Sequence, residues 1–228
     1  RFAGFREAGI NRLSMGIQSF QDELLALIGR IHDGTEARAA VAAAHRAGFE
    51  NINLDLMFGL PAQTTAQALQ DLRAAVDLQP AHISFYELTI EPNTRFYRQP
   101  PQRPDDDTLW EMQTAGRSLL DDAGYQRYEV SAYAQPGRQC RHNLNYWQFG
   151  DYLGIGAGAH AKISNAATQT ITRTSKVKHP RAYLDAASSD AHIGSHHELS
   201  VDDVILEFAM NSLRLDSGFT KSSFTAAT

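Results

Sequence analysis

Hydrophobic and polar residues alternate along three short stretches in the first half of the chain, and segments with helical periodicity lie between them. The alternating stretches are residues 12–20, 51–60 and 82–91. The helical segments are residues 22–28, 35–47 and 66–78, and Gly48 stands where a glycine commonly ends a helix. Strands that alternate with helices are typical of parallel βαβ units, so the pattern predicts an α/β fold built as a barrel or an open sheet.

Each predicted strand has one apolar face and one face of small or polar residues. The apolar residues are Leu13, Met15, Ile17, Ile52, Leu54, Leu56, Ile83 and Phe85. The polar set consists of Arg12, Ser14, Gly16, Gln18, Asn53, Asp55, His82, Ser84 and Tyr86. Because neighbouring side chains of a strand point to opposite faces, we expect the apolar set to pack against the helices. The other face then forms a polar lumen that can hold a polar ligand, unlike the Val-, Ile- and Leu-filled interior of a packed barrel.

Gln18 and Asp55 are the strongest candidates for ligand-binding residues on the polar face. Each lies near the carboxyl end of a predicted parallel strand, where ligands gather in such folds. A buried polar network or a helix cap accounts for both residues equally well from their position alone. Arg30 follows Gly29 at a helix end, where a cation that complements the helix dipole is the simpler explanation.

The regular alternation ends after Glu91. A helix is predicted over residues 104–125, a strand over 125–134, and another helix from Ser200, which is placed to cap it, with Asp203 in the first turn. Residues 165–198 are polar and contain histidines, so we interpret them as a linker.

Composition excludes several classes of protein. The formal net charge is −5 and the Lys and Arg residues are scattered, which argues against binding to a nucleic-acid backbone. No apolar run approaches the roughly 18 residues of a membrane span, and no signal peptide leads the chain. A single cysteine excludes an internal disulfide framework and suits the reducing cytoplasm. The chain begins at Arg1 and stops within a helical pattern, so we interpret it as a piece of a longer protein.

Residues 138–160, RQCRHNLNYWQFGDYLGIGAGAH, concentrate the unusual chemistry. Cys140 and His142 do not predict a metal site, because no second cysteine exists and the other histidines lie in a predicted loop. The glycine run nearly fits a dinucleotide-binding fingerprint but does not lie between a strand and a helix, so that function is rejected. His142 could ligate haem iron, and Tyr146 and Trp147 could stack on a porphyrin, but packing roles explain the same residues.

Several stretches in a fixed order resemble one family over nearly the whole chain. These are GINRLSMGIQSF, GRIH, NINLDLMFGLPAQT, HISFYELTIEPNT, YEVSAYA and CRHNLNYWQFGDYLGIGAGAH. Together they closely resemble the HemW family, haem chaperones of the radical S-adenosylmethionine superfamily that are related to oxygen-independent coproporphyrinogen III oxidases. The resemblance implies an incomplete parallel (β/α) barrel of the radical S-adenosylmethionine type, truncated at its N-terminus and followed by the start of a helical C-terminal domain.

The resemblance also assigns site residues. In this family and its oxidase relatives, the residues that correspond to Gln18, Arg30 and Asp55 contact S-adenosylmethionine. The resemblance also extends that pocket to Thr89, Ala159 and His160. HNLNYW is similar to the motif that separates the chaperones from the oxidases. The haem-site residues that this motif implies are His142, Asn143, Tyr146 and Trp147.

The chain departs from the family pattern in one important respect. The CxxxCxxC loop that binds a [4Fe–4S] cluster is absent, and a single cysteine cannot hold that cluster. We therefore expect no metal ligands here, a cluster only in the intact protein, and no cleavage of S-adenosylmethionine by this chain.

The expected organisation is a barrel with its extension over residues 1–165, a linker over 166–198, and the start of a helical domain over 199–228. The expected function of the intact protein is to bind haem and deliver it to haem-requiring proteins, in the cytoplasm or peripherally at the inner face of the membrane. The alternative is oxidative decarboxylation of coproporphyrinogen III.

Overall fold

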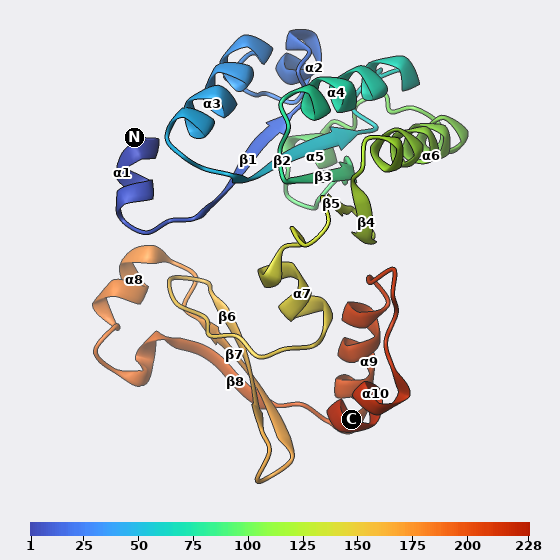
Figure 1. Cartoon of the computed structure of the whole chain (residues 1–228). Coiled ribbons are helices and arrows are strands. Elements are labelled where there is room, and N and C mark those ends of the chain that lie inside the picture. Colours follow the sequence, from blue (N-terminus) through green and yellow to red (C-terminus); the bar gives the residue numbers. More distant parts are fainter. The chain divides into compact units, whose positions relative to one another are not determined.

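Two structural units, Arg1–Gln139 and Cys140–Thr228, make up the chain in the computed structural model, which describes all residues from 1 to 228. Figure 1 shows both units, coloured along the sequence. The first unit contains a five-stranded sheet and the second a three-stranded sheet. No helix in either unit combines the length and the apolar character needed to cross a lipid bilayer.

The first unit begins with three strands separated by helices, as the hydrophobic pattern predicted. In chain order these elements are α1 (Phe2–Glu7), β1 (Arg12–Gln18), α2 (Asp22–Leu27), α3 (Gly34–Arg46), β2 (Asn51–Phe58), α4 (Thr65–Asp77) and β3 (His82–Glu87). β1, β2 and β3 pair in parallel. This confirms the predicted α/β fold with a mostly parallel sheet.

The remaining elements of the first unit are two helices and a β-hairpin that extends the sheet at its β3 edge. They are α5 (Arg95–Arg98), α6 (Asp106–Asp122), β4 (Gln126–Glu129) and β5 (Ala132–Ala134). The strand order is β1-β2-β3-β5-β4, with β5 antiparallel to both β3 and β4. The single strand predicted over residues 125–134 is therefore a hairpin, because the chain turns at Val130 and Ser131.

Local sequence signals set the ends of the helices. Asp33 forms a capping box with Glu36 at the start of α3, and Thr64 forms one with Gln67 at the start of α4. Gly48, two residues after α3, adopts a φ of 84°, the left-handed conformation that glycine takes most easily after a helix. These caps place α3 and α4 so that their apolar faces meet the sheet.

The apolar faces of β1, β2 and β3 form the main core with α3, α4 and α6, as Figure 1 shows for the helices above the sheet. Ile52, Leu54, Leu56 and Ile83 are fully buried. Burying such side chains contributes roughly 1.5–3 kcal/mol each. The helices thus cover the apolar face, and the opposite face keeps the polar residues that the alternation predicted.

The second unit contains an antiparallel sheet and four α-helices. Its elements are α7 (Arg141–Trp147), β6 (His160–Asn165), β7 (Thr170–Lys176), α8 (Pro180–Asp185), the 3₁₀ turn η1 (Asp190–His192), β8 (Ile193–Glu198), α9 (Val201–Ser212) and α10 (Lys221–Ala227). The strand order is β6-β7-β8. A small core joins Phe149 and Ile171 to Val204 and Phe208 of α9.

The structure divides the chain differently from the three parts expected from sequence. Residues 140–165 lie in the second unit rather than in an extension of the first. Residues 166–198 are not a linker, because they contain β7 and β8. Both strands are rich in polar residues, with β7 mostly half-buried and β8 mostly exposed, so they lack the apolar alternation that marks a strand against a core. Backbone pairing with neighbouring strands defines them instead.

Candidate functional site

The parallel register brings the polar residues of the first unit into rows across the sheet. Ser14 pairs with Asn53, which pairs with His82. One step toward the carboxyl ends of the strands, Asp55 pairs with Gly16 on one side and with Ser84 on the other. Residues paired in this way lie side by side on one face, so the polar set forms a continuous surface.

Gln18 has an unusual backbone conformation at the end of β1. Its φ is 70°, in the left-handed region that few residues other than glycine adopt, and the register of β1 shifts between Gly16 and Gln18. Such bulges redirect side chains next to functional sites. The Gln18 side chain is buried, and its Oε1 accepts a hydrogen bond of 3.0 Å from the Tyr86 hydroxyl.

Gly16 provides the space that this conformation needs. A Cβ atom at this position would lie 2.8 Å from Nε2 of Gln18. Any other residue at position 16 would therefore move the Gln18 amide away from its place beside Tyr86.

Asp55 is held by two donors on the same face. Its Oδ1 accepts a hydrogen bond of 2.8 Å from Nδ2 of Asn53, and its Oδ2 accepts one of 3.1 Å from the Ser14 hydroxyl. Asp55 itself is only partly buried, whereas Asn53 is buried. Its carboxylate therefore has a fixed orientation and still remains accessible to a ligand.

Tyr86 connects the three residues that the family resemblance assigns to S-adenosylmethionine. Burial raises the pKa of the Tyr86 hydroxyl, and the negative charge of Asp55 raises it further. The hydrogen bond to Gln18 and the positive charge of Arg30 act in the opposite direction. Gln18, Arg30 and Asp55 thus act on one hydroxyl group, although they come from different elements.

The residues in this region fit the chemistry of S-adenosylmethionine. A carboxylate can accept hydrogen bonds from ribose hydroxyls or an ammonium group, and a guanidinium can hold a carboxylate. Arg30 is exposed after Gly29, so its side chain is available for this. A hollow of about 240 Å³ beside the end of α2 is lined by other residues and does not include the polar face. These residues are Ala26, Leu27, Ile28, Gly29, Thr94, Arg95 and Phe96.

The three remaining residues assigned to this pocket stay predictions. Thr89 is exposed just after β3 in the first unit. Ala159 and His160 belong to the second unit, at the start of β6.

The HNLNYW motif forms helix α7 in the second unit. His142 and Tyr146 are four residues apart and share one side of the helix, and Asn143 and Trp147 share another. The Arg214 guanidinium lies 4.3 Å from the centre of the Trp147 ring, so the tryptophan side is covered by a cation.

An aromatic run extends from His142 and has an exposed histidine at its end. The rings of His142 and Tyr146 meet edge to face at 4.7 Å, and Tyr146 and Tyr152 lie 4.4 Å apart. His142 is exposed, so its imidazole is accessible as an axial ligand for haem iron.

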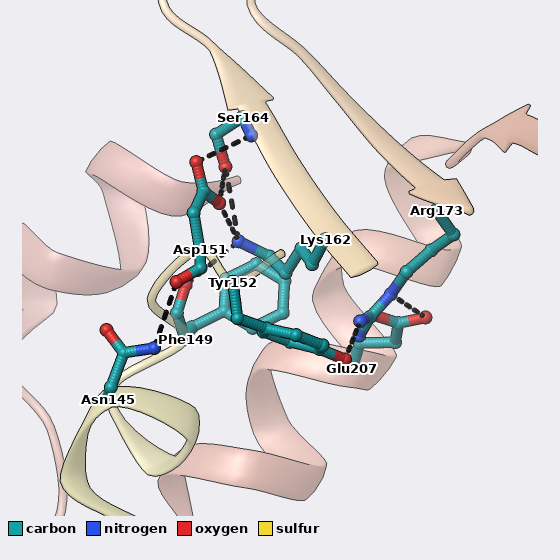
Figure 2. Close-up of polar contacts among 8 residues, drawn as sticks. All are labelled: Asn145, Phe149, Asp151, Tyr152, Lys162, Ser164, Arg173 and Glu207. Atoms are coloured by element: carbon teal, nitrogen blue, oxygen red, sulfur yellow. Dashed lines mark hydrogen bonds and ion pairs between the residues drawn. The ribbon is translucent and has the colours of Figure 1, made fainter. Parts of the chain in front are cut away.

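Polar contacts fix the segment that follows α7, as Figure 2 shows. The Lys162 ammonium group is buried and donates to the Phe149 carbonyl, Asp151 Oδ1 and the Ser164 hydroxyl at 2.9, 2.9 and 3.1 Å. It also lies 4.0 Å from the centre of the Phe149 ring. Burial raises the pKa of Asp151, but its bonds to Ser164 and Lys162 outweigh this and hold it below the usual value.

A second ion pair anchors Tyr152, also visible in Figure 2. Arg173 pairs with Glu207 of α9, and its Nη1 donates a hydrogen bond of 2.5 Å to the Tyr152 hydroxyl. Tyr152 is therefore held at one end by the guanidinium and contacts Tyr146 through its ring.

The chain does not offer the ligands of an iron–sulfur cluster. Cys140 is buried and is its only cysteine. No group of three or more His, Cys, Asp or Glu side chains is arranged to hold a metal ion. The residues of this chain therefore do not fit a cluster ligated by cysteines.

Sequence reasoning placed Tyr86, Asn53, Ser14 and His82 on the polar face but did not identify them as site residues. Their alternation with apolar residues was the available signal. It gives the face of each side chain but not its neighbours, which the register of the sheet determines.

The chain is similar to known proteins along nearly all of its sequence. Residues 1–75 match the model of the radical SAM superfamily. Heme chaperone HemW from Haemophilus influenzae is 52% identical over 98% of this chain and 57% of its own length. Heme chaperone HemW from Escherichia coli K12 is 48% identical over 100% of this chain and 59% of its length.

A more distant bacterial relative and a solved structure extend the comparison. Heme chaperone HemW from Bacillus subtilis is 37% identical over 96% of this chain and 58% of its own length. The solved structure of E. coli coproporphyrinogen III oxidase (HemN), a radical SAM enzyme, superposes with a TM-score of 0.79 at 22% identity over 99% of this chain and 54% of that one. At this identity the likeness establishes the fold alone.

The chain spans 57–59% of the length of these HemW relatives. Along nearly all of its sequence the chain is similar to proteins named heme chaperone HemW, and its residues 1–75 match the radical SAM superfamily.

Proposed function

We propose that the protein containing this chain binds haem and delivers it to haem-requiring proteins, with S-adenosylmethionine bound on the polar face of the first unit. The observation that carries the haem proposal is the exposed imidazole of His142 at the end of the aromatic run through Tyr146 and Tyr152. The similarity to proteins named heme chaperone HemW supports it.

The parts of this chain have distinct roles in the proposal. His142 would ligate the iron, and the ring of Tyr146 would contact the porphyrin. Trp147, whose ring is covered by Arg214, belongs to the proposed haem-site residues through the HNLNYW motif. Asn143 completes the proposed haem-site residues on α7. Asp55, Gln18 and Arg30 of the first unit would hold S-adenosylmethionine, with Thr89 of the same unit as additional lining. A [4Fe–4S] cluster would need ligands other than the residues of this chain, and the chemistry it would supply is an electron for bound S-adenosylmethionine.

The proposed haem transfer takes place in the cytoplasm, which the single cysteine favours. The proposal includes peripheral contact with the inner face of the membrane, because haem-requiring proteins in the membrane would receive haem there.

Haem titration of the full-length protein tests the role of His142. We expect His142→Ala to weaken haem binding about tenfold and to shift the Soret band, because the axial nitrogen is lost. His196→Ala is the matched control, since His196 is an exposed histidine on β8 with no place in the aromatic run. An unchanged spectrum and affinity in His142→Ala would show that this imidazole is not the ligand.

Calorimetry of the cluster-loaded, full-length protein tests the S-adenosylmethionine site. Asp55→Ala should lower the affinity about tenfold, and equal affinity would remove Asp55 from the pocket. The same preparation, incubated with coproporphyrinogen III, distinguishes the proposal from the oxidase alternative. Clear formation of protoporphyrinogen would contradict the chaperone function.

A further inference from the structure

Behind Asp55, a row of hydrogen bonds reaches into the interior of the first unit. Nδ1 of His82 lies 2.6 Å from Oδ1 of Asn53, and Nε2 of His82 lies 2.8 Å from the Tyr128 hydroxyl. Asn53, His82 and Tyr128 are only 2%, 0% and 9% exposed. These side chains come from β2, β3 and β4, so the row crosses most of the sheet.

The carboxylate of Asp55 determines the direction of every bond in this row. An ionised carboxylate only accepts hydrogen bonds, so Asn53 must present its NH₂ group to Asp55 and its oxygen to His82. The Ser84 hydroxyl donates a hydrogen bond of 3.1 Å to the same Asn53 oxygen, which agrees with this orientation.

The orientation of Asn53 then fixes the tautomer of His82. Because the Asn53 oxygen accepts, Nδ1 of His82 must carry the proton, and Nε2 must accept from the Tyr128 hydroxyl. The row therefore has a single direction, from the Tyr128 hydroxyl through the imidazole and the amide to the carboxylate.

We propose that Tyr128, His82 and Asn53 are positioning residues that orient the Asp55 carboxylate for S-adenosylmethionine, with His82 held as the Nδ1–H tautomer. This rests on the proposed function of Asp55. These side chains are buried, so water does not replace a lost partner. Without the hydrogen bond from His82, the Asn53 amide could rotate and turn its oxygen toward Asp55. The alanines at both ends of β5 are small, which leaves room for Tyr128 to reach His82 from β4.

Two measurements test this proposal. In protein with ¹⁵N-labelled histidine, long-range ¹H–¹⁵N spectra identify the tautomer of His82 among the nine histidines, and the signal is assigned by its loss in His82→Gln. We expect a neutral ring with the proton on Nδ1 at pH 7. An Nε2–H ring would require the Asn53 oxygen to face Asp55 and would overturn the proposal.

The second measurement is calorimetry of S-adenosylmethionine binding to the full-length, cluster-loaded protein. Asn53→Asp keeps the side-chain shape but replaces the donor that faces Asp55 by an acceptor, so we expect the affinity to fall about tenfold or more. Tyr128→Phe removes only the far end of the row and should lower the affinity less. Ile52→Val is the matched control, since Ile52 precedes Asn53 on the apolar face and its change should leave the affinity unaltered.

The outcomes separate this inference from the proposed function. Binding that is lost in Asp55→Ala but unchanged in Asn53→Asp would overturn the inference and leave the proposed site intact. No binding by the wild-type protein would overturn both. If Asn53→Asp does not fold, the tautomer of His82 in the wild type still decides the direction of the row.

Discussion

The first unit should lose stability in mild acid because of one buried histidine. Burial, together with the positive charge of Arg12, lowers the pKa of His82 from 6.5 to about 3. The imidazole is therefore neutral in the folded protein, whereas in the unfolded chain it takes up a proton below about pH 6.5.

The sign and size of the effect follow from this difference. Between the two pKa values the unfolded state binds one more proton, so stability is complete above about pH 6.5 and is lost as the pH falls toward 3. Each pH unit within this window corresponds to about 1.4 kcal/mol. Two pH units of this window, from about 6.5 down to 4.5, are crossed between pH 7.5 and pH 4.5. We therefore expect His82 alone to remove roughly 3 kcal/mol from the free energy of unfolding.

Comparison with a variant that does not titrate isolates this contribution. Hydrogen exchange of amides in β2 and β3 as a function of urea reports on the first unit, and it can be measured at both pH values for the wild type and His82→Gln. The variant should be less stable at pH 7.5, because it loses the bonds to Asn53 and Tyr128. The stability difference between wild type and variant should shrink at pH 4.5. An equal pH dependence for the two proteins would refute a neutral, buried His82.

Three further predictions address other parts of the chain. Gly16→Ala should lower S-adenosylmethionine affinity several-fold with little change in thermal stability, since the new Cβ displaces the flexible Gln18 amide. Gly4→Ala is the control for the calorimetry, because a Cβ at that position meets nothing within 4 Å. Lys162→Met should lower the free energy of unfolding of the second unit by about 2 kcal/mol in urea titrations, because the Phe149 carbonyl loses its buried donor; an unchanged midpoint would contradict this. Ser200→Ala should lower the free energy of unfolding of the second unit by about 1 kcal/mol in the same titrations, since the Ser200 hydroxyl caps α9 by accepting a hydrogen bond from the Asp203 amide. A loss of stability near zero would show that the cap is not needed.

The sequence alone determined the three parallel strands of the first unit, the helices between them and the face of each residue in these strands. The alternation around Ser14, Asp55 and Ser84 separated a polar face from an apolar one, because side-chain direction in a strand depends only on position along it. Capping residues such as Asp33 and Thr64 similarly depend on atoms within one turn of helix, so their pattern is visible in the chain. Ordered motifs along the chain were also sufficient to indicate the family.

The tertiary structure alone decided which polar residues become neighbours. Tyr86 contacts Gln18 because the parallel register and the bulge before Gln18 align β1 with β3. His82 contacts Asn53 and Tyr128 because β2 and the β4–β5 hairpin lie on either side of β3. The second sheet escaped prediction for a related reason: β7 and β8 bury little apolar surface and are defined by pairing with each other. Contacts between residues far apart in the chain depend on register and packing, and no local pattern of residues specifies them.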